Sequence, residues 1–156
     1  MKGCRCLTLV IAALPLLLAG RDLHGQGSNP RFGVWKMRSD APAPASNVMT
    51  YEPYGDGGMQ ITVEATNAAG RQTKWSYVTM FDGVYRAVTG QENAETAVEI
   101  IDGRSTRIYN KRNGRVAQII INTLSEDHNT INNEYVRFDA DGKITGVSHA
   151  TYERLR

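Results

Sequence analysis

The three histidines are the first residues to test for chemistry, and their positions predict no metal site. His24 lies in a polar N-terminal stretch, His128 in the turn-like segment "EDHN", and His149 close to the C-terminus. A protein holds a metal ion with several converging side chains. No second ligand is patterned around any of these histidines, so we expect neither a metal ion nor another cofactor.

Ser125, Asp127 and His128 have the residue types of a hydrolytic triad, but they are almost adjacent in the sequence. A nucleophile, a base and an orienting acid need separate supports in order to form a chain of hydrogen bonds. Serine and aspartate this close together more often shape a turn through side-chain-to-backbone hydrogen bonds. The sequence therefore predicts no catalytic residue.

A row of aromatic residues is the strongest sign of a binding site. In "RQTKWSYVTMF", residues 71–81, alternate positions carry aromatic or small side chains, and Lys74 and Ser76 lie opposite. The candidate ligand-binding residues are Tyr51, Trp75, Tyr77, Phe81 and Tyr85. If these side chains enclose spare volume, they form an apolar pocket with polar handles. If the enclosing structure is narrow, they simply fill it.

The segment 104–115 carries five cationic residues and no acid: Arg104, Arg107, Lys111, Arg112 and Arg115. This pattern is typical of a solvated edge strand that discourages pairing between sheets. A surface for docking an anionic polysaccharide or lipid headgroup is the alternative.

These residues require an all-β scaffold to position them. Runs with a two-residue period alternate with turn sequences such as Asp-Gly and Asn-Gly, which favour tight hairpins. We expect strands near 33–38, 48–54, 59–66, 71–81, 84–89, 97–102, 104–112, 115–125, 130–138 and 143–154. Consecutive hairpins make a meander, and closing it into an antiparallel up-and-down barrel of about 8–10 strands removes the exposed edges. A two-sheet sandwich is the competing arrangement.

Closure would pair the first strand with the last. The first carries Gly33 and Trp35, and the last carries Arg154. A guanidinium stacked on an indole contributes roughly 0.5–2 kcal/mol, so Arg154 over Trp35 would cover one end of the barrel. The alternative is that Trp35 is an ordinary core residue and Arg154 belongs to a solvated tail.

The sequence Gly33-Val34-Trp35, followed by an arginine in the last strand, resembles the lipocalin (calycin) pattern. The runs "YEP-x-G-x-G", "AGRQTKW-x-Y", "FDGVYRAVTG", "LSEDHNTI" and "DADGK…YER" are similar to those of small secreted bacterial lipocalin-like proteins with no assigned activity. The resemblance implies a barrel with a tryptophan at its base, an arginine packed across it and a ligand inside. The lipocalin Thr-Asp-Tyr motif, disulfides and C-terminal helix have no counterpart here.

The N-terminus has the pattern of a secretory signal peptide. Lys2 and Arg5 precede an apolar run at 7–19, which is shorter than the about twenty residues a membrane helix needs. We expect residues 1–26 to be signal and flexible leader, with cleavage between 20 and 27, and residues 31–156 to form one domain. Arg21 stands where a lipoprotein would carry cysteine, so we expect a secreted or periplasmic protein without a lipid anchor.

The charge balance excludes one class of partner. Of the 18 Lys and Arg residues, Lys2 and Arg5 precede the apolar run, and the remaining 16 balance the 16 Asp and Glu residues. Nucleic-acid binding normally shows as a basic excess, so we expect no nucleic-acid partner.

Three functions remain at this point. The leading hypothesis is a secreted lipocalin-like barrel that binds a small apolar or amphipathic ligand in its interior. The alternative is a filled, non-catalytic barrel that acts as an interaction or structural module through its loops or outer face. An enzyme at the barrel mouth is the third, because a fold does not fix a function. Ligand identity and oligomeric state stay open.

Overall fold

The computed structural model describes residues 29–156, and this part of the chain contains ten strands and no helix. The predicted signal peptide, its expected cleavage site and His24 lie outside the described residues. The first five strands are β1 (Gly33–Met37), β2 (Ser46–Tyr54), β3 (Gly58–Thr66), β4 (Gln72–Thr79) and β5 (Arg86–Ala87). The second five are β6 (Ala94–Ile100), β7 (Ser105–Arg112), β8 (Arg115–Leu124), β9 (Thr130–Phe138) and β10 (Ile144–Arg154). Within residues 29–156, no helix has the length and apolar character that crossing a membrane requires.

Local sequence explains both the strands and the turns between them. In β3 the side chains of Met59, Ile61 and Val63 are buried and alternate with more exposed polar ones, as a strand with one face on a core requires. Asn113 and Gly114, at the β7–β8 turn, both have positive φ angles, of 50° and 77°. Two such angles in a row define the turn that reverses a hairpin without splaying its strands.

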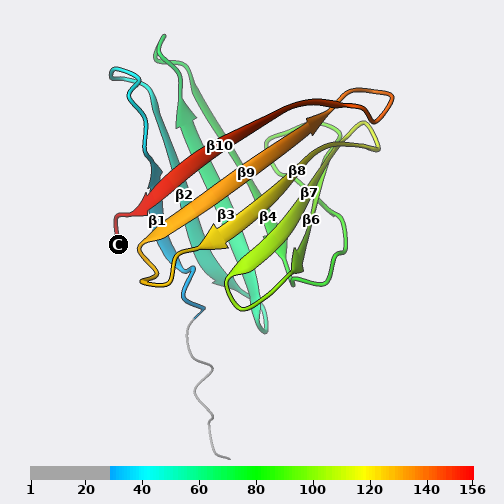
Figure 1. The fold of residues 1–156 in the computed structure, drawn as a ribbon, viewed down its shortest axis with the longest axis horizontal. Coiled ribbons are helices and arrows are strands. Elements are labelled where there is room, and N and C mark those ends of the chain that lie inside the picture. The colour runs from blue at the N-terminus through cyan, green and yellow to red at the C-terminus, as the bar shows by residue number, and fades with distance from the viewer. Residues whose placement is uncertain (1–28) are drawn as a thin grey trace, which may run out of the picture.

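All ten strands form one antiparallel sheet in the order β4-β3-β2-β1-β10-β9-β8-β7-β6-β5. The first strand therefore lies between β2 and the last strand, with Trp35 opposite Arg154 in the register (Figure 1). The sheet curls until its two margins meet. An isolated bridge between Ser76 and Thr89 shows this contact, since it joins β4 to the residues after β5. The predicted up-and-down barrel is confirmed, and the two-sheet alternative is wrong.

The two margins of the sheet meet between β4 and the segment of β5 and β6, and we call this line the seam. The strands at the seam differ most from the predicted ones. The expected strand 84–89 is reduced to the two residues of β5, and β6 begins at Ala94 instead of residue 97. The chain turns sharply at Phe81 and Gly83, whose φ angles are 58° and 71°. These left-handed residues end β4 at Thr79 and leave little length for the next strand.

The cationic segment 104–115 is not an edge, so that prediction is wrong. β7 pairs with β6 on one side and β8 on the other. One of its charges is paired with the neighbouring strand β6: the Arg107 guanidinium lies 2.9 Å from the Glu99 carboxylate. The β7–β8 hairpin is therefore part of the barrel wall.

Candidate functional site

A pocket of about 400 Å³ lies inside the barrel. Three of the predicted aromatic residues line it: Tyr51 from β2 and Trp75 and Tyr77 from β4. The Trp75 and Tyr77 rings are stacked, with centroids 6.0 Å apart and planes 15° from parallel. They form a flat section of wall, and the aliphatic lining residues are Met49, Ile61, Val63, Val88, Ala94, Ile108, Ala117 and Ile120.

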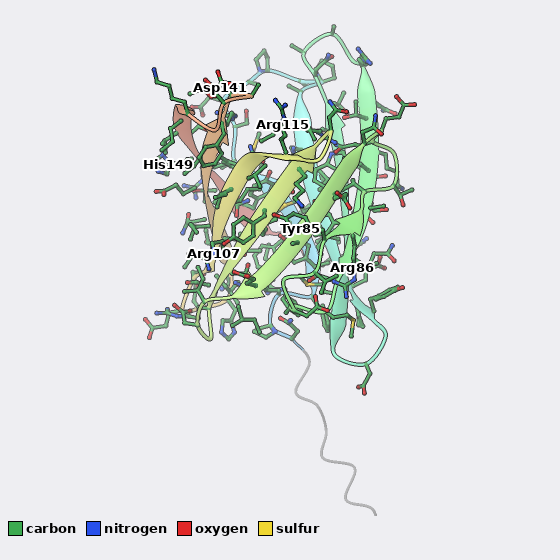
Figure 2. All side chains as sticks on the ribbon, turned by 90° about the vertical axis from the view of Figure 1, so that its right-hand side faces the viewer. Tyr85, Arg86, Arg107, Arg115, Asp141 and His149 are labelled. Carbon is green, nitrogen blue, oxygen red and sulfur yellow. The ribbon has the colours of Figure 1, made fainter. Side chains whose placement is uncertain are left out.

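Phe81 and Tyr85 do not line this pocket. Phe81 follows the end of β4 in a left-handed conformation, so the two-residue alternation that places Trp75 and Tyr77 inside no longer applies to it. It packs against the edge of the hydrophobic core instead. Tyr85 lies on the outer surface (Figure 2), where the Lys111 ammonium is 3.5 Å from the centre of its ring.

The deep part of the pocket is polar and uncharged. Asn122, only 1% exposed, donates from Nδ2 to Asn133 Oδ1 at 2.8 Å and to the Tyr51 hydroxyl at 3.4 Å. Asn133 in turn donates to the Tyr135 hydroxyl at 3.0 Å. All four of these residues line the pocket. Asn122 Oδ1 is buried and has no hydrogen-bond partner among residues 29–156.

A second polar strip runs along the neighbouring strands. The Thr96 hydroxyl donates to Asn110 Oδ1 at 2.8 Å, and Asn110 Nδ2 donates to Gln118 Oε1 at 3.0 Å. On the opposite wall, the Tyr152 hydroxyl donates to Asn47 Oδ1 at 3.3 Å. Amides and hydroxyls therefore supply the polar groups of the interior.

Burial keeps the interior phenols in their neutral form. Desolvation raises the pKa of Tyr51 and of Tyr77 well above the ordinary range, because a phenolate would lose its hydration there. The interior therefore presents hydrogen-bonding groups and aromatic faces without a formal charge from its tyrosines.

The charged lining residues lie at one end of the barrel: Glu95 at the start of β6, Lys111 and Arg112 at the end of β7, and Arg137 near the end of β9. These strand ends adjoin Arg115, the first residue of β8, and the turn that carries Asp141, and Figure 2 shows both residues at the upper end of the barrel. Arg112 also donates a hydrogen bond to the side chain of Gln91. We call this end the mouth.

The opposite end, the base, is closed by Trp35 and Arg154. Trp35 is fully buried, and the Arg154 guanidinium carbon lies 4.1 Å from the centre of its ring. Arg154 also donates to three backbone carbonyls: that of His128 at 2.8 Å, that of Phe32 at 2.7 Å, and that of Pro30. These bonds fix the guanidinium across the indole.

Arg31 adds an inner layer to the base that sequence reasoning missed. Its guanidinium is buried and donates to the backbone carbonyls of Asn122, at 3.3 Å, and of Arg104. Its own carbonyl accepts a 2.9 Å hydrogen bond from the Trp35 indole N–H. Desolvation lowers the Arg31 pKa from its ordinary value. Residue 31 stands at the predicted domain boundary, next to a stretch expected to be leader, so no pattern pointed to a buried role.

The interior asparagines were also missed, although a signal for them existed. In β8 the residues Gln118, Ile120, Asn122 and Leu124 share one phase of the two-residue period. Three of them line the pocket, and Leu124 is fully buried below it. Polar residues on the inward phase of a barrel strand indicate a polar interior.

Several candidate groups are not brought together. His149 lies on the outside of the barrel, 3.2 Å from the Glu134 carboxylate. Ser125 and Asp127 form a turn, in which the serine hydroxyl donates to the carboxylate at 2.6 Å. In the part of the chain that the structure describes, no cluster of His, Cys, Asp and Glu side chains is placed to hold a metal ion.

Comparison with known proteins defines the fold. No protein-family model matches the chain, and no curated protein matches it in sequence. The crystal structure of the wild-type fluorescent protein UnaG is similar over 80% of this chain and 96% of its own, with a TM-score of 0.55 and 11% identity. The fatty-acid-binding protein 1 of Echinococcus granulosus is similar over 81% and 98%, with a TM-score of 0.55 and 12% identity. At these identities the likeness concerns the fold alone, which is an antiparallel meander barrel.

Proposed function

We propose that this protein binds a small apolar or amphipathic molecule inside its barrel. The observation that supports the proposal most directly is the interior pocket of about 400 Å³. Aromatic side chains form part of its wall, uncharged polar groups lie in its deep part, and charged residues line its mouth. Small-molecule sites have this form, with volumes of roughly 300–1,000 Å³. A barrel filled by its own side chains would leave no such space, so the volume counts against the filled-barrel alternative.

Two further considerations agree with this function. The similar structure from Echinococcus granulosus is, by its name, a fatty-acid-binding protein, so a barrel of this kind accommodates a ligand. The base is sealed by Trp35, Arg31 and Arg154, which leaves the mouth as the route into the pocket. We also propose that the protein is exported, as the apolar segment 7–19 indicates; mass spectrometry of the mature N-terminus tests this.

Uptake of N-phenyl-1-naphthylamine, an uncharged fluorescent probe, tests the binding function. We expect the probe to bind with quenching of tryptophan emission. Trp75→Ala should weaken binding about tenfold or more, because a large aromatic side chain contributes roughly 1.5–3 kcal/mol of apolar contact.

Lys74→Ala is the matched control. Lys74 is adjacent to Trp75 on β4, but its side chain is directed outward and pairs with Glu64 at 2.9 Å. This variant should bind the probe like the wild type. A folded wild-type protein that takes up no probe would contradict the proposal and favour an interaction module.

A further inference from the structure

The least satisfied group in the pocket is the side-chain amide of Asn122. Its Oδ1 is buried and has no partner within residues 29–156, whereas its Nδ2 is fully engaged. A buried polar atom without a hydrogen bond costs about 1–3 kcal/mol, and such atoms are uncommon in native proteins. Since Asn122 lines the pocket, a ligand can supply the missing hydrogen bond.

The chain of hydrogen bonds through Tyr51, Asn122, Asn133 and Tyr135 can run in either direction. Rotating both amides lets the hydroxyls donate and leaves the NH2 group of Asn122 unpaired in place of its oxygen. In both directions the free group is uncharged, and a hydroxyl or amide on the ligand can bond to it. The site thus accepts groups that both donate and accept.

The distribution of charge disfavours a carboxylate at this depth. The charged lining residues Glu95, Lys111, Arg112 and Arg137 are all at the mouth. Arg31 lies below Asn122, and its buried Nε has no hydrogen-bond partner within residues 29–156. Arg31 does not line the pocket, however, and its Nη2 is bonded to two backbone carbonyls. A carboxylate beside Asn122 would lose its hydration without a lining cation to replace it.

The shape of the wall favours a flat molecule. Trp75 and Tyr77 present two nearly parallel rings along one side of the pocket. Planar ring systems stack on such surfaces in offset arrangements. A flexible alkyl chain would gain apolar contact there but no stacking.

We propose that the ligand is an uncharged, planar molecule whose hydroxyl or amide group hydrogen-bonds to Asn122 at the bottom of the pocket. This inference rests on the proposed function, since it specifies the chemistry of the same site. It excludes a fatty acid bound with its carboxylate innermost.

Displacement of N-phenyl-1-naphthylamine by three matched compounds tests the inference. The compounds are 2-naphthamide, 2-methylnaphthalene and 2-naphthoate, which share a ring system and differ in one substituent. We expect the wild type to bind 2-naphthamide about tenfold more tightly than either of the others, because only the amide is neutral and completes the hydrogen bonds of Asn122.

Asn122→Leu should abolish this preference, because it removes the amide while approximately keeping the volume. Asn132→Ala is the control: Asn132 also lies on the β8–β10 wall, but it is exposed and bonds outward to Thr151. This variant should keep the wild-type preference. The selectivity of the wild type is itself a test, so the inference does not depend on the folding of Asn122→Leu.

The outcomes distinguish a failure of this inference from a failure of the proposed binding function on which it rests. If the probe binds but 2-methylnaphthalene or 2-naphthoate displaces it as well as 2-naphthamide does, the ligand class is wrong and the binding function stands. A preference that persists in folded Asn122→Leu also overturns the assignment. If the probe does not bind at all, the proposed function fails, and the ligand class fails with it.

Discussion

Gly33 shows how strongly one residue is constrained at the closed end of the barrel. Its φ angle is +139°, a conformation that side chains with a Cβ rarely adopt. A Cβ at this position would overlap the Arg156 carbonyl oxygen and lie 2.8 Å from Arg154 Nη1. The absence of a side chain is what lets the end of the chain pack directly against β1.

Gly33→Ala is therefore expected to lower the free energy of unfolding by about 1–3 kcal/mol, through backbone strain and displacement of the C-terminal residues. Urea unfolding followed by circular dichroism measures the change. Gly146→Ala is the control, because a Cβ there meets nothing within 4 Å, and it should change stability by less than about 0.5 kcal/mol. Equal effects of the two substitutions would contradict this account.

At the scale of residues, alternation predicted side chains only where a strand continues. It placed Trp75 and Tyr77 on one face, and both line the pocket, but it failed for Phe81 and Tyr85 once the chain turned. The polar residue Asn122 was missed because it directly follows the aliphatic run Ile119–Ile121, in which no two-residue period is visible. Within a barrel strand, a polar residue at an inward-facing position indicates a polar interior, whereas the aliphatic residues around it do not distinguish a pocket from a filled core.

At the scale of elements, the seam where β4 meets the segment of β5 and β6 is the part of the barrel wall with the weakest strand pairing. In the described chain one isolated bridge joins β4 itself to the residues after β5, with Ser76 N donating to Thr89 O at 3.0 Å and Thr89 N to Ser76 O at 2.8 Å. A second bridge, between Asp82 and Glu99, joins the turn after β4 to β6. The other side of β4 pairs with β3 along its whole length, from Gln72 to Thr79. The seam therefore has fewer hydrogen bonds to break when the wall opens.

Hydrogen exchange should detect this difference within β4. Because the Ser76 N–H faces the seam, the amides of Lys74 and Val78 face it too, whereas those of Trp75 and Tyr77 face β3. We expect Lys74 and Val78 to exchange much faster than Trp75 and Tyr77, since local opening at the seam requires less free energy. Equal protection of all four amides would show that the seam is as stable as the rest of the barrel.

The sequence predicted the long strands well and the seam poorly, for one physical reason. β3, β8, β9 and β10 each have nine or more residues, so their two-residue period is visible above the background. β5 has two residues, which is too short to show a period at all. Its existence depends on pairing with β6, a tertiary contact that no local pattern reports.

At the scale of the whole molecule, the buried phenols predict instability at alkaline pH. Burial raises the pKa of Tyr51, Tyr77 and Tyr152 in the folded state above the value of about 10 for an unfolded chain. The folded state thus holds protons that the unfolded state releases. Their contribution to stability is complete below about pH 10 and declines as the pH rises further.

Urea unfolding between about pH 8 and pH 11 tests this, with tyrosinate absorbance recorded alongside. We expect the unfolding midpoint to fall above about pH 10, and the fall to be smaller in Tyr77→Phe, which cannot ionise at that position. Tyr54, which is 45% exposed, supplies the control: Tyr54→Phe should leave the pH dependence unchanged. A midpoint that does not decline above about pH 10 would contradict the argument.

The pairing of β1 with β10 also determines which way the barrel mouth is oriented when the protein is attached to a carrier or a surface. Val34 N donates to Arg156 O at 2.8 Å, so the C-terminus lies beside the first strand at the sealed pole. Asn29, where the described chain begins, bonds to Phe32 at the same pole. A carrier, tag or surface anchor joined at Asn29 or Arg156 would therefore leave the mouth directed away from the attachment, accessible to the ligand that we propose.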